Sequence, residues 1–250
     1  MVAFILEEAG KQPNTNAFAD RYNNVFIKKG TAAHYPCVAA HIDSVQPIDR
    51  KFTVVQSNGL LVGIDENGQR VGFGGDDKSG VFICLELLKR FDNIAVTFFA
   101  AEEIGCQGSS KADAKVFDDI GYVLEFDCPA NDMLSYTSSG TRLFANNGDF
   151  IKAGLPVLNQ FGLTKWQHHP YSDVMALRRR FDISCMNLSS GYYNWHSRNE
   201  CVKVSDTFNS VEMATALVHA LGERRYEFGR GVVEEDAPPV KVTNLVYPEP

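Results

Sequence analysis

Four short, almost continuous apolar runs constrain the fold of this chain more than any other feature of its sequence. They cover residues 36–41, 95–101, 121–126 and 183–188. A strand with one solvated face alternates apolar and polar residues, whereas a continuous apolar strand is typical of a sheet that is covered on both faces. The runs therefore predict the buried strands of a mainly parallel sheet.

Segments with helical patterns lie between and after these runs. Residues 79–90 and 205–226 carry apolar side chains at helical spacing, with Ser205 as a plausible N-cap of the second segment, and residues 171–180 are a shorter candidate. Strands that alternate with helices predict an α/β fold, here a three-layer α/β/α sandwich with a mixed, mainly parallel central sheet. Residues 52–72 are rich in glycine and asparagine, which predicts antiparallel ribbons joined by tight turns.

The domain organisation predicted from the sequence is simple. A length of 250 residues suffices for one large α/β domain or two small ones. The sequence contains no internal repeat, and after Phe228 its composition shifts to glycine, proline and acidic residues. We therefore predict a single domain over residues 1–228 and a C-terminal tail over residues 229–250.

Composition excludes several classes of function. The chain has 31 acidic and 24 basic residues, a formal charge of −7, which argues against binding of nucleic acid. It has no apolar run long enough to span a bilayer, and its N-terminus lacks the features of a secretion signal. Its six cysteines form no Cys-x-x-Cys pair, and three of them (Cys37, Cys84 and Cys185) lie in apolar runs, as expected for reduced, buried thiols. We therefore expect a cytoplasmic protein that binds neither nucleic acid nor membranes.

Three of the apolar runs end in residue types that bind metals. The first run ends at His41 and is followed by Asp43, the second is followed by Glu102 and Glu103, and the third is followed by Asp127. The ligand crevice of an open α/β sheet lies beyond the carboxyl ends of its strands, so these side chains should converge. Burial of so many carboxylates without a cation would be very unfavourable. The sequence therefore predicts a metal ion at this edge of the sheet.

Each of these signals has a structural alternative when it stands alone. A pair of glutamates is usually solvated surface, and the glycine-rich segment 72–80 could be only a flexible turn that leads into a helix. Within that segment, Lys78 is more easily interpreted as a charge partner of Asp77 than as a nucleophile. His196 lies in a polar loop after the fourth apolar run, where a surface histidine is the usual interpretation.

Taken together, the motifs resemble one family, the co-catalytic di-zinc exopeptidases, specifically the peptidase T and carboxypeptidase G branch and its aminopeptidase relatives. The resemblance covers about residues 35 to 220. The matching motifs, in the order of the family, are His41-Ile42-Asp43-Ser44-Val45, Gly75-Asp76-Asp77-Lys78-Ser79-Gly80, Ala101-Glu102-Glu103-Ile104-Gly105, Glu125-Phe126-Asp127, Ser172-Asp173-Val174 and His196-Ser197-Arg198-Asn199-Glu200.

The resemblance implies a binuclear metal site. By position in the motifs, Asp76 would bridge two metal ions, His41 and Asp127 would complete one site, and Glu103 and His196 would complete the other. The metal implied is zinc, two ions per chain, although a carboxylate-rich set with two histidines also accepts cobalt or manganese. The domain over residues 1–228 would then be the catalytic domain.

The resemblance also implies catalytic roles and a substrate class. Glu102 would be the general base, and Asp43 would hold the imidazole of His41 through the nitrogen that does not bind metal. We expect an exopeptidase, in particular an aminopeptidase that acts on short peptides. Two alternatives stay open: an N-acyl amino acid amidohydrolase that uses the same site, and a non-catalytic binding module with the same fold.

The chain departs from the branch that it resembles in one respect. Peptidase T-like enzymes usually carry a lid or dimerisation domain between the third-strand aspartate and the last histidine, but here Asp127 and His196 are only 69 positions apart. We therefore predict a catalytic domain without a lid, and the oligomeric state stays open. Residues that could take over contacts of the lid with the substrate, although packing or surface roles are more common for them, are His168, His169, Tyr192, Tyr193, Trp166 and Trp195.

Overall fold

A nine-stranded sheet forms the centre of the described part of the chain, residues 1–47 and 51–228 of the computed structural model. Its strands, in spatial order, are β1 (Thr15–Ala19), β2 (Val25–Lys29), β7 (Ile94–Phe99), β3 (Tyr35–His41), β8 (Ile120–Cys128), β12 (Cys185–Ser189), β9 (Met133–Ser138) and β10 (Thr141–Arg142), with β11 (Lys165–His169) paired to β9. The predicted tail, residues 229–250, lies outside the described residues.

The middle of this sheet consists of the four strands predicted from the apolar runs. β7, β3, β8 and β12 are parallel to one another, and every residue in them is buried. The outer pairs, β1 with β2, β2 with β7, β12 with β9 and β9 with β10, are antiparallel. The predicted mixed, mainly parallel sheet is thus confirmed. The ends of the strands differ from the predicted runs by one or two residues. At the end of β7, the strand stops at Phe99, and Ala101 takes a φ of +59°.

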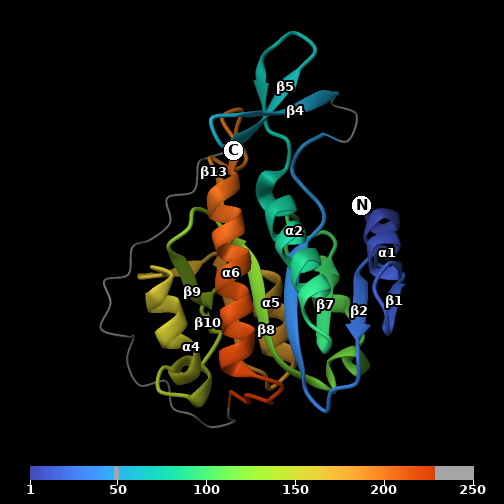
Figure 1. The fold of residues 1–250 in the computed structure, drawn as a ribbon, viewed down its shortest axis with the longest axis vertical. Helices are drawn as coiled ribbons and strands as arrows, with labels where there is room; N and C mark the ends of the chain where they lie inside the picture. Colours follow the sequence, from blue (N-terminus) through green and yellow to red (C-terminus); the bar gives the residue numbers. More distant parts are fainter. Residues whose placement is uncertain (48–50, 229–250) are drawn as a thin grey trace.

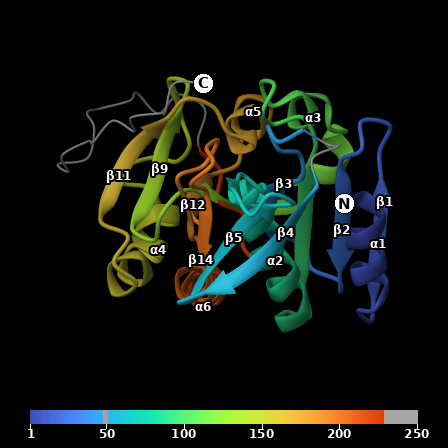
Figure 2. The same cartoon turned by 90° about the horizontal axis from the view of Figure 1, so that it is seen from above.

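Helices cover both faces of the sheet and complete three layers (Figure 1 and Figure 2). The helices on one face are α2 (Gly75–Arg90), α4 (Asp149–Gln160) and α6 (Val204–Leu221). Those on the other face are α3 (Gln107–Lys111) and α5 (Asp173–Arg180). The remaining helical segments are α1 (Val2–Gly10), which packs on β1, and the 3-10 helix η1 (Ala114–Phe117).

The predicted helices are present with shifted ends. The helix predicted over residues 205–226 begins at Val204 and follows Lys203, so Ser205 lies inside the first turn and does not cap it. It ends at Leu221 because Gly222 takes a φ of +67°, which a helix cannot continue. α2 is assigned from Gly75, but Asp76 and Asp77 have non-helical backbone angles, so its regular part begins after Asp77, close to the predicted residue 79.

A second, smaller sheet lies at one end of α2. Its strands are β13 (Tyr192–Tyr193), β14 (Cys201–Lys203), β5 (Leu60–Asp65), β4 (Phe52–Ser57) and β6 (Arg70–Val71), all antiparallel. The antiparallel ribbons predicted for residues 52–72 are confirmed, and β4 and β5 extend beyond the rest of the molecule (Figure 1). Because β14 pairs with β5, the loop that precedes β14 lies beside the segment that leads into α2.

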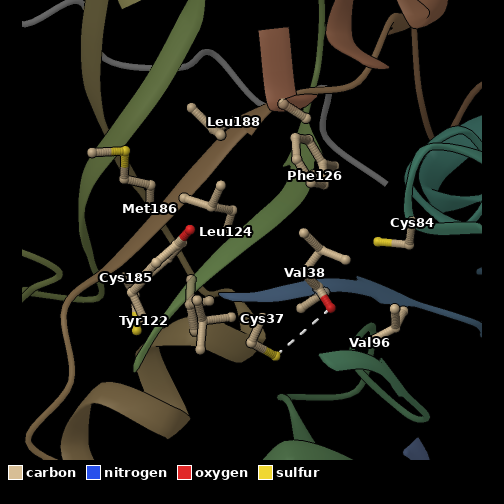
Figure 3. Packing of buried hydrophobic residues seen from close by; sticks show 14 of the residues in the cluster. Cys37, Val38, Cys84, Val96, Tyr122, Leu124, Phe126, Cys185, Met186 and Leu188 are labelled. Atoms are coloured by element: carbon tan, nitrogen blue, oxygen red, sulfur yellow. Dashed lines mark hydrogen bonds between the residues drawn. The ribbon is translucent and has the colours of Figure 1, made fainter. Parts of the chain in front are cut away.

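The hydrophobic core fills the space between the main sheet and its helices (Figure 3). Cys37, Cys84 and Cys185 are free thiols that are fully buried in it, as predicted. Burial raises the pKa of the Cys37 thiol to about 12, so this side chain behaves as a small apolar group. Within the described ranges, every helix is too short or too polar to cross a bilayer.

Candidate metal centre

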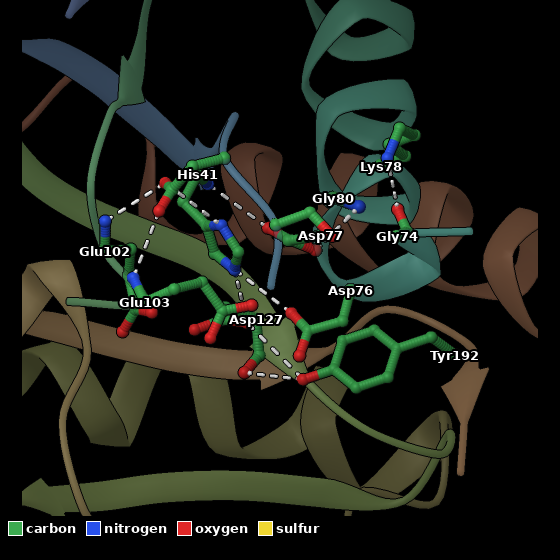
Figure 4. Close-up of polar contacts among 12 residues, drawn as sticks. His41, Gly74, Asp76, Asp77, Lys78, Gly80, Glu102, Glu103, Asp127 and Tyr192 are labelled. Atoms are coloured by element: carbon green, nitrogen blue, oxygen red, sulfur yellow. Dashed lines mark hydrogen bonds and ion pairs between the residues drawn. The ribbon is translucent and has the colours of Figure 1, made fainter. Parts of the chain in front are cut away.

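Three strands of the main sheet bring polar side chains to one edge (Figure 4). β3 ends at His41, β8 carries Asp127 next to its last residue, and the turn after β7 carries Glu102 and Glu103. β3 lies between β7 and β8 and is parallel to both, so the three strand ends meet at the same edge. The side chains that were predicted to converge beyond the strand ends therefore lie at one edge of the sheet.

Asp76 reaches the same edge from the start of α2. Gly74 precedes the helix with a φ of +75°, a conformation that favours glycine, and Asp76 then faces the strand ends (Figure 4). Asp76 Oδ1 lies 3.0 Å from His41 Nε2, and Asp76 Oδ2 lies 3.2 Å from His196 Nε2. One carboxylate is thus shared between two histidines from distant parts of the sequence.

The side chains form two groups that have Asp76 in common. In the first group, Asp127 Oδ1 lies 3.5 Å from His41 Nε2, and the two side chains are only 5% and 1% exposed. In the second group, Glu103 Oε2 lies 3.0 Å from His196 Nε2, and the histidine side chain is 34% exposed. The first group is therefore enclosed by protein, whereas the second lies closer to the surface.

The pKa shifts in this region show an excess of negative charge. Burial, together with the charge of Asp127, raises the pKa of Glu102 well above its usual value, and burial also raises the pKa of Asp127 itself. Hydrogen bonds to Asp76 and Glu103 raise the pKa of His196 to about 10. The raised pKa of each of these groups means that it favours its protonated form. Protonation reduces the excess of negative charge in the site, as a bound cation would.

The donor atoms suit a divalent metal ion. His41, Asp76 and Glu103 each offer a ligand atom, all within 4.8 Å of one another, and His41, Glu102 and Asp127 do the same. These two sets share His41 and cut across the two groups around Asp76, which His196 joins through its contacts with Asp76 and Glu103. Imidazole nitrogens and carboxylate oxygens form the ligand sets of catalytic zinc sites, and a bound cation replaces the protons that the site otherwise holds. The residues thus fit the metal that the sequence motifs imply.

Asp43 connects two of the strand ends through its carboxylate. Its Oδ1 accepts a hydrogen bond from the N–H of Glu102 at 3.0 Å, and its Oδ2 accepts one from the N–H of Glu103 at 3.2 Å. Asp43 Oδ1 also lies 3.6 Å from His41 Nδ1, the ring nitrogen that faces away from Asp76. The predicted contact with His41 is therefore longer than a normal hydrogen bond. The two hydrogen bonds with the backbone were not indicated by the sequence.

Other side chains that surround the site have different partners from those expected. Tyr192, a candidate donor to the substrate, directs its hydroxyl to Asp127, at 3.2 Å from the carbonyl oxygen and 3.4 Å from Oδ1 (Figure 4). Tyr193 donates to Asp206 instead. The Nζ of Lys78 donates to the carbonyl oxygens of residues 73 and 74, each at 3.0 Å, and the charge of Asp77 acts on Lys78 without a direct hydrogen bond.

A cavity of about 820 Å³ opens over the two groups. Its lining consists of four acidic side chains (Asp76, Glu102, Glu103 and Asp127) together with Val45, Pro129, His169, Pro170, Tyr171, Tyr192, Trp195 and His196. Of the aromatic and histidine candidates from the sequence, His169, Tyr192 and Trp195 therefore line the cavity. Trp166 is instead part of the hydrophobic core, and His168 contacts the hydroxyl of Tyr136 at 3.1 Å.

The fold and the motifs match a known family of peptidases. The sequence model of peptidase family M28 matches residues 24–220, a span that contains every residue of the site described above. No curated protein matches the chain.

Solved structures share the fold at low sequence identity. Aminopeptidase PepT from Bacillus cereus ATCC 10987 matches with a TM-score of 0.68 and 12% identity, over 88% of this chain and 91% of that chain. A tripeptidase from Staphylococcus aureus subsp. aureus Mu50 has a TM-score of 0.69 and 11% identity over the same shares of the two chains, 88% and 91%. Aminopeptidase APDkam598 from the archaeon Desulfurococcus kamchatkensis has a TM-score of 0.61 and 12% identity, over 87% and 88%. At these identities the likeness concerns the fold.

Proposed function

Because the chain belongs to peptidase family M28, and is thus a metal-dependent exopeptidase, we propose that it is an aminopeptidase with two metal ions that acts on short peptides. The observation that carries this proposal is the position of Asp76, whose two oxygens face His41 and His196 separately. A carboxylate shared in this way is the arrangement that a binuclear site requires. The cytoplasmic location expected from the sequence stays a prediction.

The two groups around Asp76 would each hold one ion, zinc by preference. His41, Asp76 and Asp127 would hold the buried ion, and Asp76, Glu103 and His196 would hold the other; cobalt or manganese would fit the same donors. When bound, such a pair of ions acts as a Lewis acid on the scissile carbonyl and lowers the pKa of the attacking water.

Glu102 has the properties of the general base. Its side chain is 5% exposed and lines the cavity beside Asp127, and its backbone is fixed by Asp43. A carboxylate in this position could take a proton from the attacking water and release it to the departing amine.

The matched structures favour a free N-terminal amine over an N-acyl amino acid as the substrate. Proteins that share the fold include two aminopeptidases and a tripeptidase. The described lining residues of the cavity also include no lysine or arginine that could bind the carboxylate of an N-acyl amino acid. The aminopeptidase is therefore preferred to the amidohydrolase.

The test compares metal-loaded wild-type protein with Glu102→Gln on free-amine dipeptides and tripeptides and on N-acylated amino acids. We expect zinc-dependent release of the N-terminal residue by the wild type, and a loss of kcat of roughly 10²–10⁴-fold in Glu102→Gln with its zinc content unchanged. Glu212→Gln, an exposed position on α6 whose side chain pairs with Arg90, is the matched control and should keep full activity. Hydrolysis of the N-acylated panel alone would favour the amidohydrolase, and turnover by Glu102→Gln equal to the wild type would remove Glu102 from the mechanism.

A further inference from the structure

Glu200 is a buried carboxylate that the proposed chemistry does not use. The residue is only 1% exposed, although it is charged. Its Oε2 accepts hydrogen bonds from the N–H groups of Phe73 at 2.6 Å and Gly74 at 2.8 Å, and its Oε1 accepts one from the N–H of Asp76 at 3.2 Å. The Glu200 side chain thus binds three of the four backbone N–H groups from Phe73 to the shared aspartate, Asp76.

The same residue is part of the loop that carries His196. Glu200 lies four positions after His196 and directly before β14, whose pairing with β5 fixes the end of this loop. Arg70 holds the loop from its other side, since its Nη2 donates to the carbonyl oxygens of Glu200 at 2.8 Å and of Asn199 at 3.1 Å. Glu200 therefore connects the segment that presents His196 with the segment that presents Asp76.

Only a carboxylate can make these three contacts. It has two oxygens that act purely as acceptors, whereas the amide of glutamine has one acceptor oxygen and an NH₂ group that would face a backbone donor. The backbone also leaves room for a close approach: a Cβ on Gly75 would lie 3.5 Å from Glu200 Oε1 and 2.7 Å from Val202 Cγ2. The contact therefore depends on the charge of the side chain as well as on its size.

The two metal-binding groups depend on this contact to different degrees. The first group takes His41 and Asp127 from two neighbouring strands of the main sheet, β3 and β8. The second group takes His196 from a loop, and that histidine is 34% exposed. Loss of the Glu200 contacts should therefore move Asp76 and His196 apart. This displaces two of the three ligands of the second group, whereas the first group is affected only through Asp76.

We infer that Glu200 is a positioning residue that sets the affinity of the second metal site, the one formed by Asp76, Glu103 and His196. The inference rests on the proposed binuclear function. Removal of the three hydrogen bonds lowers the affinity of that site more than that of the first site, because two of its ligands lose their relative position. Residues that orient metal ligands typically contribute 10–100-fold to metal affinity.

The experiment is a titration of metal-stripped, full-length protein with zinc alone, followed by calorimetry and by direct metal analysis. Wild type binds two zinc ions. Glu200→Gln binds the first ion with an affinity within about 3-fold of the wild type and the second at least ~10-fold more weakly. Its kcat, measured at limiting zinc, falls and recovers in excess zinc, whereas KM stays unchanged. His196→Ala should lose the same ion, and the double variant should add little to either single change. Glu212→Gln controls for the Glu→Gln exchange itself.

The outcomes separate the inference from the proposed function. Binding of two ions by Glu200→Gln with wild-type affinities would overturn the inference alone, as would an equal weakening of both ions. Binding of fewer than two ions by the wild type would overturn the proposed function and the inference with it. If Glu200→Gln does not fold, as judged by circular dichroism, Glu200→Asp replaces it under the same criteria, because its shorter side chain keeps the charge but cannot reach all three N–H groups.

Discussion

The carboxylate of Asp76 is the point at which the two groups of the candidate metal centre meet. Its two oxygens lie 3.0 Å and 3.2 Å from the Nε2 atoms of His41 and His196. A neutral amide could not face two ring nitrogens equally, since its oxygen and nitrogen have opposite hydrogen-bonding character. The chemical type of the residue and its position after a glycine-rich turn were both visible in the sequence.

Asp43 provides a test at the scale of one residue. In Asp43→Asn, an NH₂ group takes the place of one of the two carboxylate oxygens. The backbone N–H of Glu102 or of Glu103 then loses its acceptor. The Glu102-Glu103 turn and the ring of His41 should then shift together. We expect kcat/KM to fall by roughly 10–100-fold, with zinc affinity reduced in the same range, as measured by steady-state kinetics and zinc titration.

Asp119→Asn is the matched control for this change. Asp119 pairs with Lys28 on the surface, and its side chain is 38% exposed. Its substitution should leave kcat/KM within about 2-fold, because exposed ion pairs contribute little. If Asp43→Asn behaves like this control, Asp43 neither orients His41 nor holds the turn.

Residue roles that depend on the tertiary structure were not visible in the sequence. Glu200 was part of a recognised motif, yet its three backbone partners lie more than 120 positions away and no local pattern indicates them. The contact of the Tyr192 hydroxyl with Asp127 was not visible in the sequence either, because it depends on β13 lying next to the end of β8 in the folded chain. Lys78 was assigned to the nearest acidic residue, but the geometry of the turn directs its Nζ to carbonyl oxygens.

At the scale of elements, the strands covered on both faces were predictable, whereas the outer strand β1 and the helix α4 were not. β3, β7, β8 and β12 have continuous apolar sequences because helices cover both sides. The outer strand β1 is mostly exposed, so its sequence resembles a polar loop. α4 contains Pro156 inside the helix, a residue that normally argues against a helical assignment.

The packing of α2 on β8 gives a prediction for a whole element. A Cβ on Gly80 would lie 2.4 Å from the carbonyl oxygen of Phe126 and 2.4 Å from Asp77 Oδ2. Neither group can move freely, so Gly80→Ala should push the helix away from the strand that carries Asp127. We expect a loss of about 1–3 kcal/mol in the free energy of unfolding, measured by urea denaturation.

Gly10→Ala is the control for this substitution. Gly10 is the last residue of α1, and a Cβ there meets no atom within 4 Å. Its substitution should leave stability unchanged or slightly increase it, because alanine has less freedom in the unfolded chain. A Gly80→Ala protein as stable as Gly10→Ala would show that α2 and β8 can separate without cost.

At the scale of the whole molecule, burial of acidic side chains extends beyond the metal-binding groups. Glu125 and Asp173 are fully buried behind them, and one oxygen of each has no hydrogen-bond partner within the described residues. Burial raises the pKa of Asp173 to about 7, and burial together with the charge of Asp173 raises the pKa of Glu125 well above its usual value. Ionisation of Glu125 or Asp173 therefore places a negative charge in the interior of the protein.

This arrangement determines how the stability of the metal-free protein depends on pH. An unfolded aspartate has a pKa of about 4, so between that value and pH 7 the folded state binds more protons at Asp173 than the unfolded state does. Stability must then decrease as the pH rises through this interval, and Glu125 and Glu102 act in the same direction. Asp76, whose pKa is lowered, acts in the opposite direction, but its contribution changes only below this interval.

We expect the melting temperature of metal-stripped protein to be higher at pH 5.5 than at pH 8, by roughly 5 °C or more, as measured by scanning calorimetry. Zinc should raise the melting temperature more at pH 8, because its ligands must be deprotonated to bind it. Asp173→Asn removes one buried titrating group and keeps an oxygen that can accept from Ser109, so its melting temperature should depend less on pH than that of the wild type. A metal-free wild type whose melting temperature rises between pH 5.5 and 8 would contradict the expected burial of these acids in their protonated form.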